Sequence, residues 1–221
     1  MSFRILALET ATEACSAAVL ADAAVYQRFE IRPRAHLRLL LPMVESVLAE
    51  AELALSDMDA IAFGRGPGGF TGLRIAAGVA QGLALGAQLP VIPVSNLAVL
   101  AAAALQDTTA RKVLVCQDAR MGEVYWAPFE RGEDGLPVAL GPERVGPPED
   151  VVVEGSDWLG AGSGWIEFPQ LRLGFQGVIE SVARWPNAAD VAAIALTELR
   201  AGRAVAPEHA APTYVRDSVT Q

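Results

Sequence analysis

Residues 60–86 read AIAFGRGPGGFTGLRIAAGVAQGLALG, and the rest of the chain can be understood from this stretch outward. Its first four residues form an apolar run too short for a helix, and residues 64–69 combine glycine, arginine and proline in an order that neither helix nor strand tolerates. Thr71 stands where an N-cap would, and residues 72–86 have helical length and composition. The stretch predicts a buried strand, a tight turn and a helix.

The expected helix carries glycines at every fourth position, Gly78, Gly82 and Gly86, which therefore share one face. Each glycine destabilises an exposed helix by roughly 0.5 to 1 kcal/mol relative to alanine, so we expect another backbone to approach that face closely. Only Arg74 and Gln81 are strongly polar between residues 72 and 87. We predict that the sheet covers one side of this helix and that a second protein covers another.

A glycine turn before a helix also makes an anion site, because free N–H groups and the helix dipole converge there. The pattern Gly64-x-Gly66-x-x-Gly69 matches the dinucleotide fingerprint, but the next strand is followed by Ser95-Asn96, with no acid to bind a ribose. A Walker loop is excluded because the turn has no lysine. Anion binding and a purely structural role for the glycines both stay open.

Composition limits the classes of function. A formal charge of −9 and a pI near 4.7 argue against a chain that grips nucleic acid by itself, and 52% hydrophobic residues suffice for a packed core. No apolar run reaches the length of a membrane span and no signal peptide is evident, so we expect a cytoplasmic protein without a membrane role. Cys15 and Cys116 lack CxxC spacing and are expected to be buried, reduced and unreactive.

The order of elements predicts the fold. Apolar runs at residues 4–9, 15–22 and 23–31 predict an antiparallel meander, and an amphipathic helix is expected over residues 35–53. A strand at residues 90–94 and a helix up to residue 105 follow the central stretch. This βββαβαβα order is that of the ribonuclease H-like fold shared by actin, sugar kinases and the heat-shock chaperone ATPases.

A second, abridged copy of the same lobe is expected after residue 105. A strand at residues 112–117, an acid at Asp118 and a strand at residues 123–129 repeat the opening pattern, with Asp118 in the place of Glu9. The fold class predicted is therefore α/β, with two ribonuclease H-like lobes. We expect an N-terminal lobe over residues 1–105 and a smaller C-terminal lobe over residues 106–221.

The residues carry a resemblance to a known family. GPGGFTGLRI at residues 66–75 resembles the GPGSFTGLRIG signature of the bacterial TsaB (YeaZ-type, glycoprotease-like) family of tRNA threonylcarbamoyladenosine biosynthesis proteins, with Gly69 replacing serine and Ala76 the last glycine. Residues 5–20 resemble the family's opening and Asp118 to Tyr125 its midpoint. PTYVR at residues 212–216 resembles its C-terminal PxYxR.

The resemblance implies a non-catalytic scaffold. Such a protein pairs with TsaD, allows the ATPase TsaE to join, and supports threonylcarbamoyl transfer to adenosine 37 of ANN-decoding tRNA. The implied chain binds no cofactor: the complex uses ATP, and tRNA is bound only as part of that complex. A homodimer is expected to be possible when TsaD is absent.

The residues that an enzyme of this fold would need are missing. In related ATPases the first hairpin turn contains a glycine that helps to hold phosphate, whereas residues 9–13 read ETATE. TsaD binds metal through paired histidines, but this chain has only His36 and His209, so we expect neither metal nor catalysis. The alternative is a small stand-alone actin-like ATPase or sugar kinase. Possible anion or nucleotide contacts are Glu9, Thr10, Gly68, Gly69, Thr71 and Arg74.

The predicted partner surface combines two helices. Leu39 and Met43 are four residues apart and project to a flank of the amphipathic helix, where they could form a second apolar stripe. We expect Leu39, Met43, Gly78, Gly82 and Gly86 to contact the partner.

Overall fold

The chain forms two compact units. The structure, a computed structural model, describes every residue except 1–2, 107, 174, 176, 180–183 and 217–221. Unit 1 contains Met1–Asn96 and Pro186–Thr213, and unit 2 contains Leu97–Trp185 and Tyr214–Gln221. The expected boundary after residue 105 is therefore corrected in two places, since the first unit ends at Asn96 and regains a segment near the C-terminus.

Unit 1 is built on a five-stranded sheet with the order β3-β2-β1-β4-β5. The strands β1 (Ile5–Glu9), β2 (Ala14–Ala21) and β3 (Ala24–Ile31) are antiparallel neighbours, as the meander predicted. Strand β4 (Ala60–Gly66) pairs in parallel with β1, and β5 (Val91–Ser95) pairs in parallel with β4. This order confirms the ribonuclease H-like topology.

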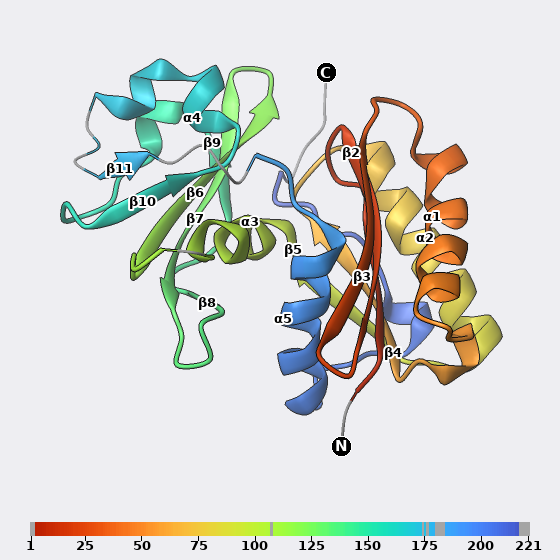
Figure 1. The fold of residues 1–221 in the computed structure, drawn as a ribbon. Helices are drawn as coiled ribbons and strands as arrows, with labels where there is room; N and C mark the ends of the chain where they lie inside the picture. Colours follow the sequence, from red (N-terminus) through yellow and green to blue (C-terminus); the bar gives the residue numbers. More distant parts are fainter. Residues whose placement is uncertain (1–2, 107, 174, 176, 180–183, 217–221) are drawn as a thin grey trace. The chain divides into compact units, whose positions relative to one another are not determined.

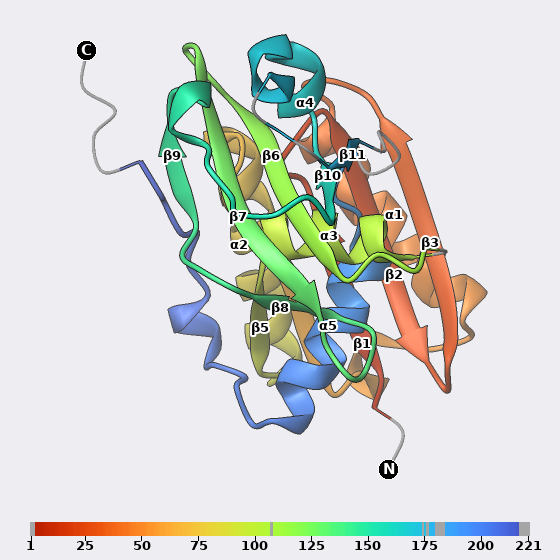
Figure 2. The same ribbon diagram turned by 90° about the vertical axis from the view of Figure 1, so that its left-hand side faces the viewer.

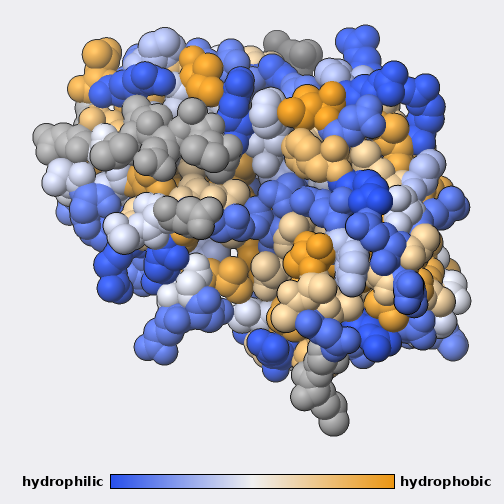
Figure 3. Space-filling model, in the orientation of Figure 1, coloured by the Kyte–Doolittle hydropathy of each residue, from blue (hydrophilic) through white to orange (hydrophobic). Residues whose placement is uncertain are grey.

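Three helices cover this sheet. Helices α1 (His36–Glu50) and α2 (Phe70–Ala87) lie side by side on one face, and α5 (Ala188–Arg200) lies on the other (Figure 1). Short 3-10 helices, η1 (Leu55–Asp57) and η4 (Pro207–His209), complete the unit. Figure 3 views the side of unit 1 that carries β3, where hydrophobic patches alternate with hydrophilic ones.

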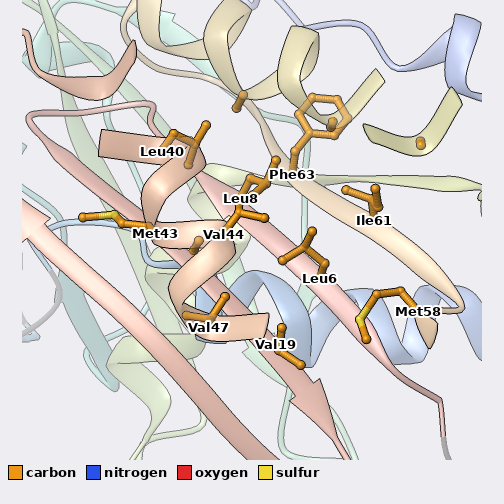
Figure 4. Close-up of a cluster of buried hydrophobic side chains, with 14 of the residues drawn as sticks. Leu6, Leu8, Val19, Leu40, Met43, Val44, Val47, Met58, Ile61 and Phe63 are labelled. Atoms are coloured by element: carbon orange, nitrogen blue, oxygen red, sulfur yellow. The ribbon is translucent and has the colours of Figure 1, made fainter. Parts of the chain in front are cut away.

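The core of unit 1 lies between the sheet and the helices α1 and α2. Leu40, Val44 and Val47 of α1 face Leu6 and Leu8 of β1 (Figure 4). All five side chains are buried, in agreement with the helical period of the apolar residues in this segment.

Helix α2 begins earlier than the sequence suggested. Its N-cap is Gly69 rather than Thr71, and no side chain caps it, so Thr71 lies within the first turn. The Gly69 N–H donates to the carbonyl oxygen of Ala11 at 2.7 Å, which fixes the chain before the helix. By length and composition alone α2 could cross a membrane, but core helices of soluble proteins pass the same test, and α2 packs against β4 of this unit.

Unit 2 repeats the topology in shorter form. Its strands are β6 (Lys112–Arg120), β7 (Glu123–Arg131), β8 (Pro137–Ala139), β9 (Arg144–Gly146), β10 (Trp158–Ala161) and β11 (Val178–Ile179). The sheet order is β11-β10-β6-β7-β8, with β9 also paired to β7 (Figure 2). Because β6 is antiparallel to β7 and parallel to β10, the run β7-β6-β10-β11 matches β2-β1-β4-β5 of unit 1.

The helices of unit 2 explain the corrected boundary. Helix α3 (Asn96–Leu105) places Leu97 and Leu100 in a buried cluster with Val113 and Phe129 of β6 and β7, so its apolar side belongs to unit 2. Helix α4 (Gly164–Glu167) and the 3-10 helices η2 (Pro148–Asp150) and η3 (Pro169–Arg172) are short. In unit 1 the face of the sheet opposite α1 and α2 is covered by α5, whose residues lie far along the chain from the strands of that sheet.

Candidate functional site

A buried carboxylate joins the strands beneath the N-terminus of α2. Glu9 ends β1 with no exposed surface; its Oε1 accepts the Ala11 N–H at 2.6 Å, and its Oε2 accepts the Asn96 Nδ2–H at 2.5 Å. The Oδ1 of Asn96 in turn accepts the Gly66 N–H at 2.6 Å. We call Glu9, Asn96 and these two backbone groups the Glu9 network. It ties the first hairpin turn to the glycine turn.

Two opposing effects set the acidity of Glu9. Burial raises its pKa from 4.5 to about 7, because the charged form loses its hydration, while hydrogen bonds from Ala11, Asn96 and the Thr10 backbone lower it. Burial is the larger effect. Glu9 therefore changes charge near neutral pH, unlike an ordinary surface glutamate.

The space around this carboxylate is already filled. A Cβ on Gly64 would overlap the Glu9 carboxylate, and a Cβ on Gly72 would overlap the carbonyl oxygen of Thr10. The Thr10 hydroxyl donates to the Gly72 carbonyl at 2.8 Å, and Thr10 has no exposed surface either. Neither Glu9 nor Thr10 is open to a ligand in this structure. The glycines of the turn serve close packing.

The other predicted anion contacts lie nearer the surface. Gly68 is half-buried against Ala11, whereas Gly69, Thr71 and Arg74 are exposed at the start of α2. The Arg74 guanidinium stacks 3.7 Å from the centroid of the Phe70 ring. The structure thus separates the six predicted residues into a buried pair, Glu9 and Thr10, and an outer group on and before the first turn.

The glycine face of α2 is open. A Cβ on Gly78, Gly82 or Gly86 would meet no other atom within 4 Å, and all three residues are exposed. No part of this chain that the structure describes therefore approaches this face. Leu85 on the same helix is 72% exposed and Phe70 is 52% exposed, so the helix presents apolar side chains beside its bare backbone.

Helix α1 contributes different residues from those expected. Met43 is buried in the core and Leu39 packs against it, so the stripe proposed from their spacing faces inward. Instead Leu37 and Leu41, one turn apart, are 77% and 46% exposed. The exposure of Leu37 and Leu41 was not predicted, because both residues fit the same helical pattern as the core positions of α1.

These residues define one surface. The name α1–α2 surface is used below for the exposed apolar and glycine positions of the two neighbouring helices: Leu37, Leu41, Phe70, Gly78, Gly82, Leu85 and Gly86.

Among the described residues, no cluster of three or more His, Cys, Asp or Glu side chains is placed to hold a metal ion. The Nε2 of His36 lies 2.8 Å from the Thr12 carbonyl and 3.2 Å from that of Ala14; both partners are acceptors, so this nitrogen carries the proton. His36 thus braces the first hairpin turn from the start of α1.

Both cysteines are buried and free, as the sequence predicted. Burial raises the pKa of the Cys15 thiol to about 12, and it raises the pKa of Cys116 further above its ordinary range. Since the thiolate is the nucleophile, neither group is suited to covalent catalysis.

Two sequence motifs meet in unit 2. The Arg216 guanidinium pairs with the Glu123 carboxylate, donates to the Ala119 carbonyl at 3.2 Å, and lies 6.0 Å from the centroid of the Tyr125 ring. The arginine of the C-terminal PTYVR motif therefore binds to the motif at residues 118–125. Neither the contact between these two motifs nor the hydrogen bonds of Asn96 could be predicted from the sequence, because the partners lie far apart along the chain.

Comparison with known proteins shows which family the chain resembles. The family model described as "TsaD: tRNA N6-adenosine threonylcarbamoyltransferase" matches residues 28–170. The curated TsaB protein of Escherichia coli strain K12 is 44% identical, over 98% of this chain and 96% of its own length. The TsaB protein of Haemophilus influenzae is 38% identical, over 98% of this chain and 94% of its length.

Solved structures from Pseudomonas aeruginosa are similar throughout. One, described as an uncharacterized protein with similarity to peptidase YeaZ, has a TM-score of 0.91 at 44% identity and covers 97% of this chain and 100% of its own. Another, described as YeaZ, has a TM-score of 0.89 at 43% identity and covers 96% and 99%. The fold and the match to the family model place the chain in the class of TsaD-like proteins with two ribonuclease H-like lobes. Within that class the chain belongs to the TsaB family of tRNA threonylcarbamoyladenosine biosynthesis.

Proposed function

We propose that this protein is a non-catalytic scaffold subunit of the complex that makes N6-threonylcarbamoyladenosine at position 37 of ANN-decoding tRNA. In this role it works in the cytoplasm, pairs with TsaD through the α1–α2 surface, and allows TsaE to join. The complex uses ATP and holds the tRNA, while this chain contributes no cofactor site of its own.

The observation that carries the proposal is the open glycine face of α2. Three glycines spaced by four residues weaken an exposed helix by roughly 0.5 to 1 kcal/mol each, yet nothing in the described chain approaches them. A partner helix can come close only where side chains are absent. The exposed Leu37 and Leu85 add apolar area that a partner would bury at roughly 25 cal/mol per Å².

The kind of partner follows from the fold. A TsaD-like relative shares the ribonuclease H-like lobe and can present two equivalent helices, which makes a four-helix contact. The same surface would pair with a second copy of this chain when TsaD is absent, since a two-fold contact uses one patch twice.

The alternative of a stand-alone ATPase has less support. The Glu9 carboxylate and its hydrogen-bond partners fill the place beneath the glycine turn, and an ionised carboxylate there would repel a phosphate. ATP turnover by the purified chain, lost on Glu9→Ala, would favour the enzyme instead.

The test replaces glycine with a bulky residue on the open face. Gly82→Leu has room within its own chain, so the protein should fold normally while its affinity for TsaD falls at least about tenfold, equivalent to about 1.4 kcal/mol. Titration calorimetry measures the affinity, sedimentation measures self-association, and threonylcarbamoylation of tRNA gives the activity.

The matched control is Leu173→Glu in unit 2, which alters a residue that is 88% exposed and lies outside the α1–α2 surface. It should bind TsaD as the parent does. Equal affinities for Gly82→Leu and the parent protein, both shown to be folded by circular dichroism, would place the interface elsewhere.

A further inference from the structure

Strand β3 forms an unprotected edge of the sheet in unit 1 (Figure 2). In the described part of this unit it pairs only with β2, in one unbroken register from Ala14 with Ile31 to Ala21 with Ala24. The strand contains neither lysine nor proline and has no bulge, although these are the features that usually keep sheet edges from pairing. A long regular edge of this kind is a template for one more strand.

The turn before β3 shows which of its backbone groups point outward. Asp22 and Ala23 form a two-residue turn with positive φ at both positions, so Ala21 and Ala24, which close this turn, are a hydrogen-bonded pair. Hydrogen-bonded positions alternate along an antiparallel ladder. The N–H and C=O groups that point away from β2 are therefore those of residues 25, 27, 29 and 31.

An apolar stripe lies beside this outer edge. Tyr26 packs against the core beneath α1, and side chains alternate along a strand, so residues of odd number lie on the opposite face of β3. On that face Val25, Phe29 and Ile31 are 49%, 42% and 47% exposed. A strand added at the edge would bring its own side chains against this stripe.

The charges of β3 indicate that the added strand is β3 of a second copy. In an antiparallel pair of two such edges, residues of odd number must face each other, since they carry the outward backbone groups. With Phe29 opposite Phe29 of the second copy, Arg28 lies opposite Glu30, twice by symmetry. Shifting one copy by two residues places Arg28 opposite Arg28 in one direction and Glu30 opposite Glu30 in the other. One register therefore joins opposite charges, and its neighbours join like charges.

Ion pairs within the chain are compatible with this register. Nη1 of Arg28 lies 2.6 Å from Oε2 of Glu50 and donates to the Gln27 carbonyl at 3.0 Å, and Oε1 of Glu30 lies 3.3 Å from Nη1 of Arg32. All four charged side chains are at least 43% exposed, and such surface pairs contribute little to stability. A guanidinium has several N–H donors, while carboxylates and carbonyls accept more than one hydrogen bond, so Arg28 and Glu30 can also bond across the copies.

We propose that two copies of this chain pair β3 with β3 in antiparallel fashion, with Phe29 at the two-fold axis. The two five-stranded sheets then form one continuous sheet. This contact shares no residue with the α1–α2 surface, so it does not rest on the proposed pairing with TsaD.

The first experiment tests the charges by sedimentation of the full chain at up to about 0.1 mM. All proteins carry Gly82→Leu, which weakens self-association through the α1–α2 surface. Dimers should form, and Arg28→Glu or Glu30→Arg should each weaken them at least about tenfold, because like charges then face each other. A mixture of these two variants should restore dimers, since every facing pair is again of opposite charge. Arg111→Glu, an exposed arginine of unit 2, is the matched control and should change nothing.

The second experiment tests the register. Phe29→Cys would place two thiols across the axis within reach of a disulfide, whereas Val25→Cys, at a position of similar exposure, would lie about 26 Å from its counterpart. Mild oxidation with copper phenanthroline should link the first variant and leave the second unlinked. Cys15 and Cys116 are buried and should not react.

Three results would overturn the proposal, provided that circular dichroism shows folded proteins. The first is a monomeric Gly82→Leu protein at every concentration, which would assign all self-association to the α1–α2 surface. The second is a mixture of Arg28→Glu and Glu30→Arg that associates no better than either variant alone. The third is equal crosslinking of Val25→Cys and Phe29→Cys.

Discussion

The two units share one strand topology but use their first acidic residue differently. In unit 1, Glu9 is fully buried and its two oxygens accept hydrogen bonds from Ala11 and Asn96. In unit 2, Asp118 holds the corresponding place but pairs at 2.9 Å with the Arg120 guanidinium, whose side chain is 71% exposed. The same position thus braces two turns from the interior in unit 1, whereas in unit 2 its side chain, 12% exposed, pairs with an exposed arginine.

The glycine turns that follow are more alike than the helices they introduce. Gly72 comes so close to Thr10 that a Cβ would overlap the carbonyl, and Gly162 stands in the same relation to Cys116. Yet α2 has 18 residues and α4 has four. In both units a glycine near the start of the helix is constrained by close contact with a backbone carbonyl in or just after the first strand, whereas the helices that follow differ in length.

The two units also differ in what covers their sheets. In unit 1 the long helices α1 and α2 lie over the strands, and their outer side remains available to a partner. In unit 2 a cluster with Trp126, Trp158 and Trp165 replaces most of the missing helix. A domain can therefore lose a crossover helix if bulky aromatic side chains fill its volume.

The largest expected effect is a change in the free energy of unfolding with pH, which arises from the burial of Glu9. The pKa of Glu9 is about 7 in the folded chain against 4.5 ordinarily, so folding favours its protonated form. Its contribution to stability is complete below pH 4.5 and is lost as the pH rises to about 7, a change of about 3 kcal/mol.

Urea denaturation from pH 4 to 8 measures this change as the difference between the parent protein and Glu9→Ala. The variant should be less stable at low pH, because Asn96 and Ala11 lose their acceptor, but its profile should lack the fall between pH 4.5 and 7. Parallel profiles for Glu9→Ala and the parent would show that the pKa of Glu9 is the same in the folded and unfolded chains, and would contradict the prediction.

A second prediction compares two glycines of α2. Gly72→Ala forces a methyl group against the Thr10 carbonyl, so we expect a loss of about 1–3 kcal/mol from overpacking. Gly78→Ala has no neighbour within 4 Å and should gain about 0.5–1 kcal/mol, because alanine favours the helix. Thermal and urea denaturation of both variants decide it, and an equal response from the two glycines would contradict the packing described for the turn.

The smallest effect concerns the hairpin turns. The turn between β2 and β3 uses Asp22 and Ala23, both with positive φ (49° and 68°), whereas the turn between β6 and β7 ends with a glycine, Gly122, at φ 79°. Ala23→Gly should stabilise unit 1 by up to about 1 kcal/mol, since glycine adopts this conformation without steric cost. A lower midpoint of thermal unfolding for Ala23→Gly would show that chain entropy outweighs the relief of strain; Ala24→Gly, within β3, is the control expected to lose stability.

The sequence by itself determined the order of elements, the glycine turn and the family. Apolar periods of two and 3.6 residues are local signals, and the run at residues 66–75 is distinctive enough to identify relatives. It also predicted the repeat of the strand–acid–strand pattern in unit 2, because that echo is written in adjacent residues.

Only the tertiary structure decided which side of each helix faces outward and which distant residues meet. The apolar period grouped Leu37 and Leu41 with the core positions of α1 and placed Met43 on a flank, whereas the structure exposes the two leucines and buries Met43. Asn96 reaches Glu9 across 87 positions, and α5 joins the sheet of the first unit from the far end of the chain. Such contacts depend on how the strands are ordered in space, and no local pattern of residues records that order.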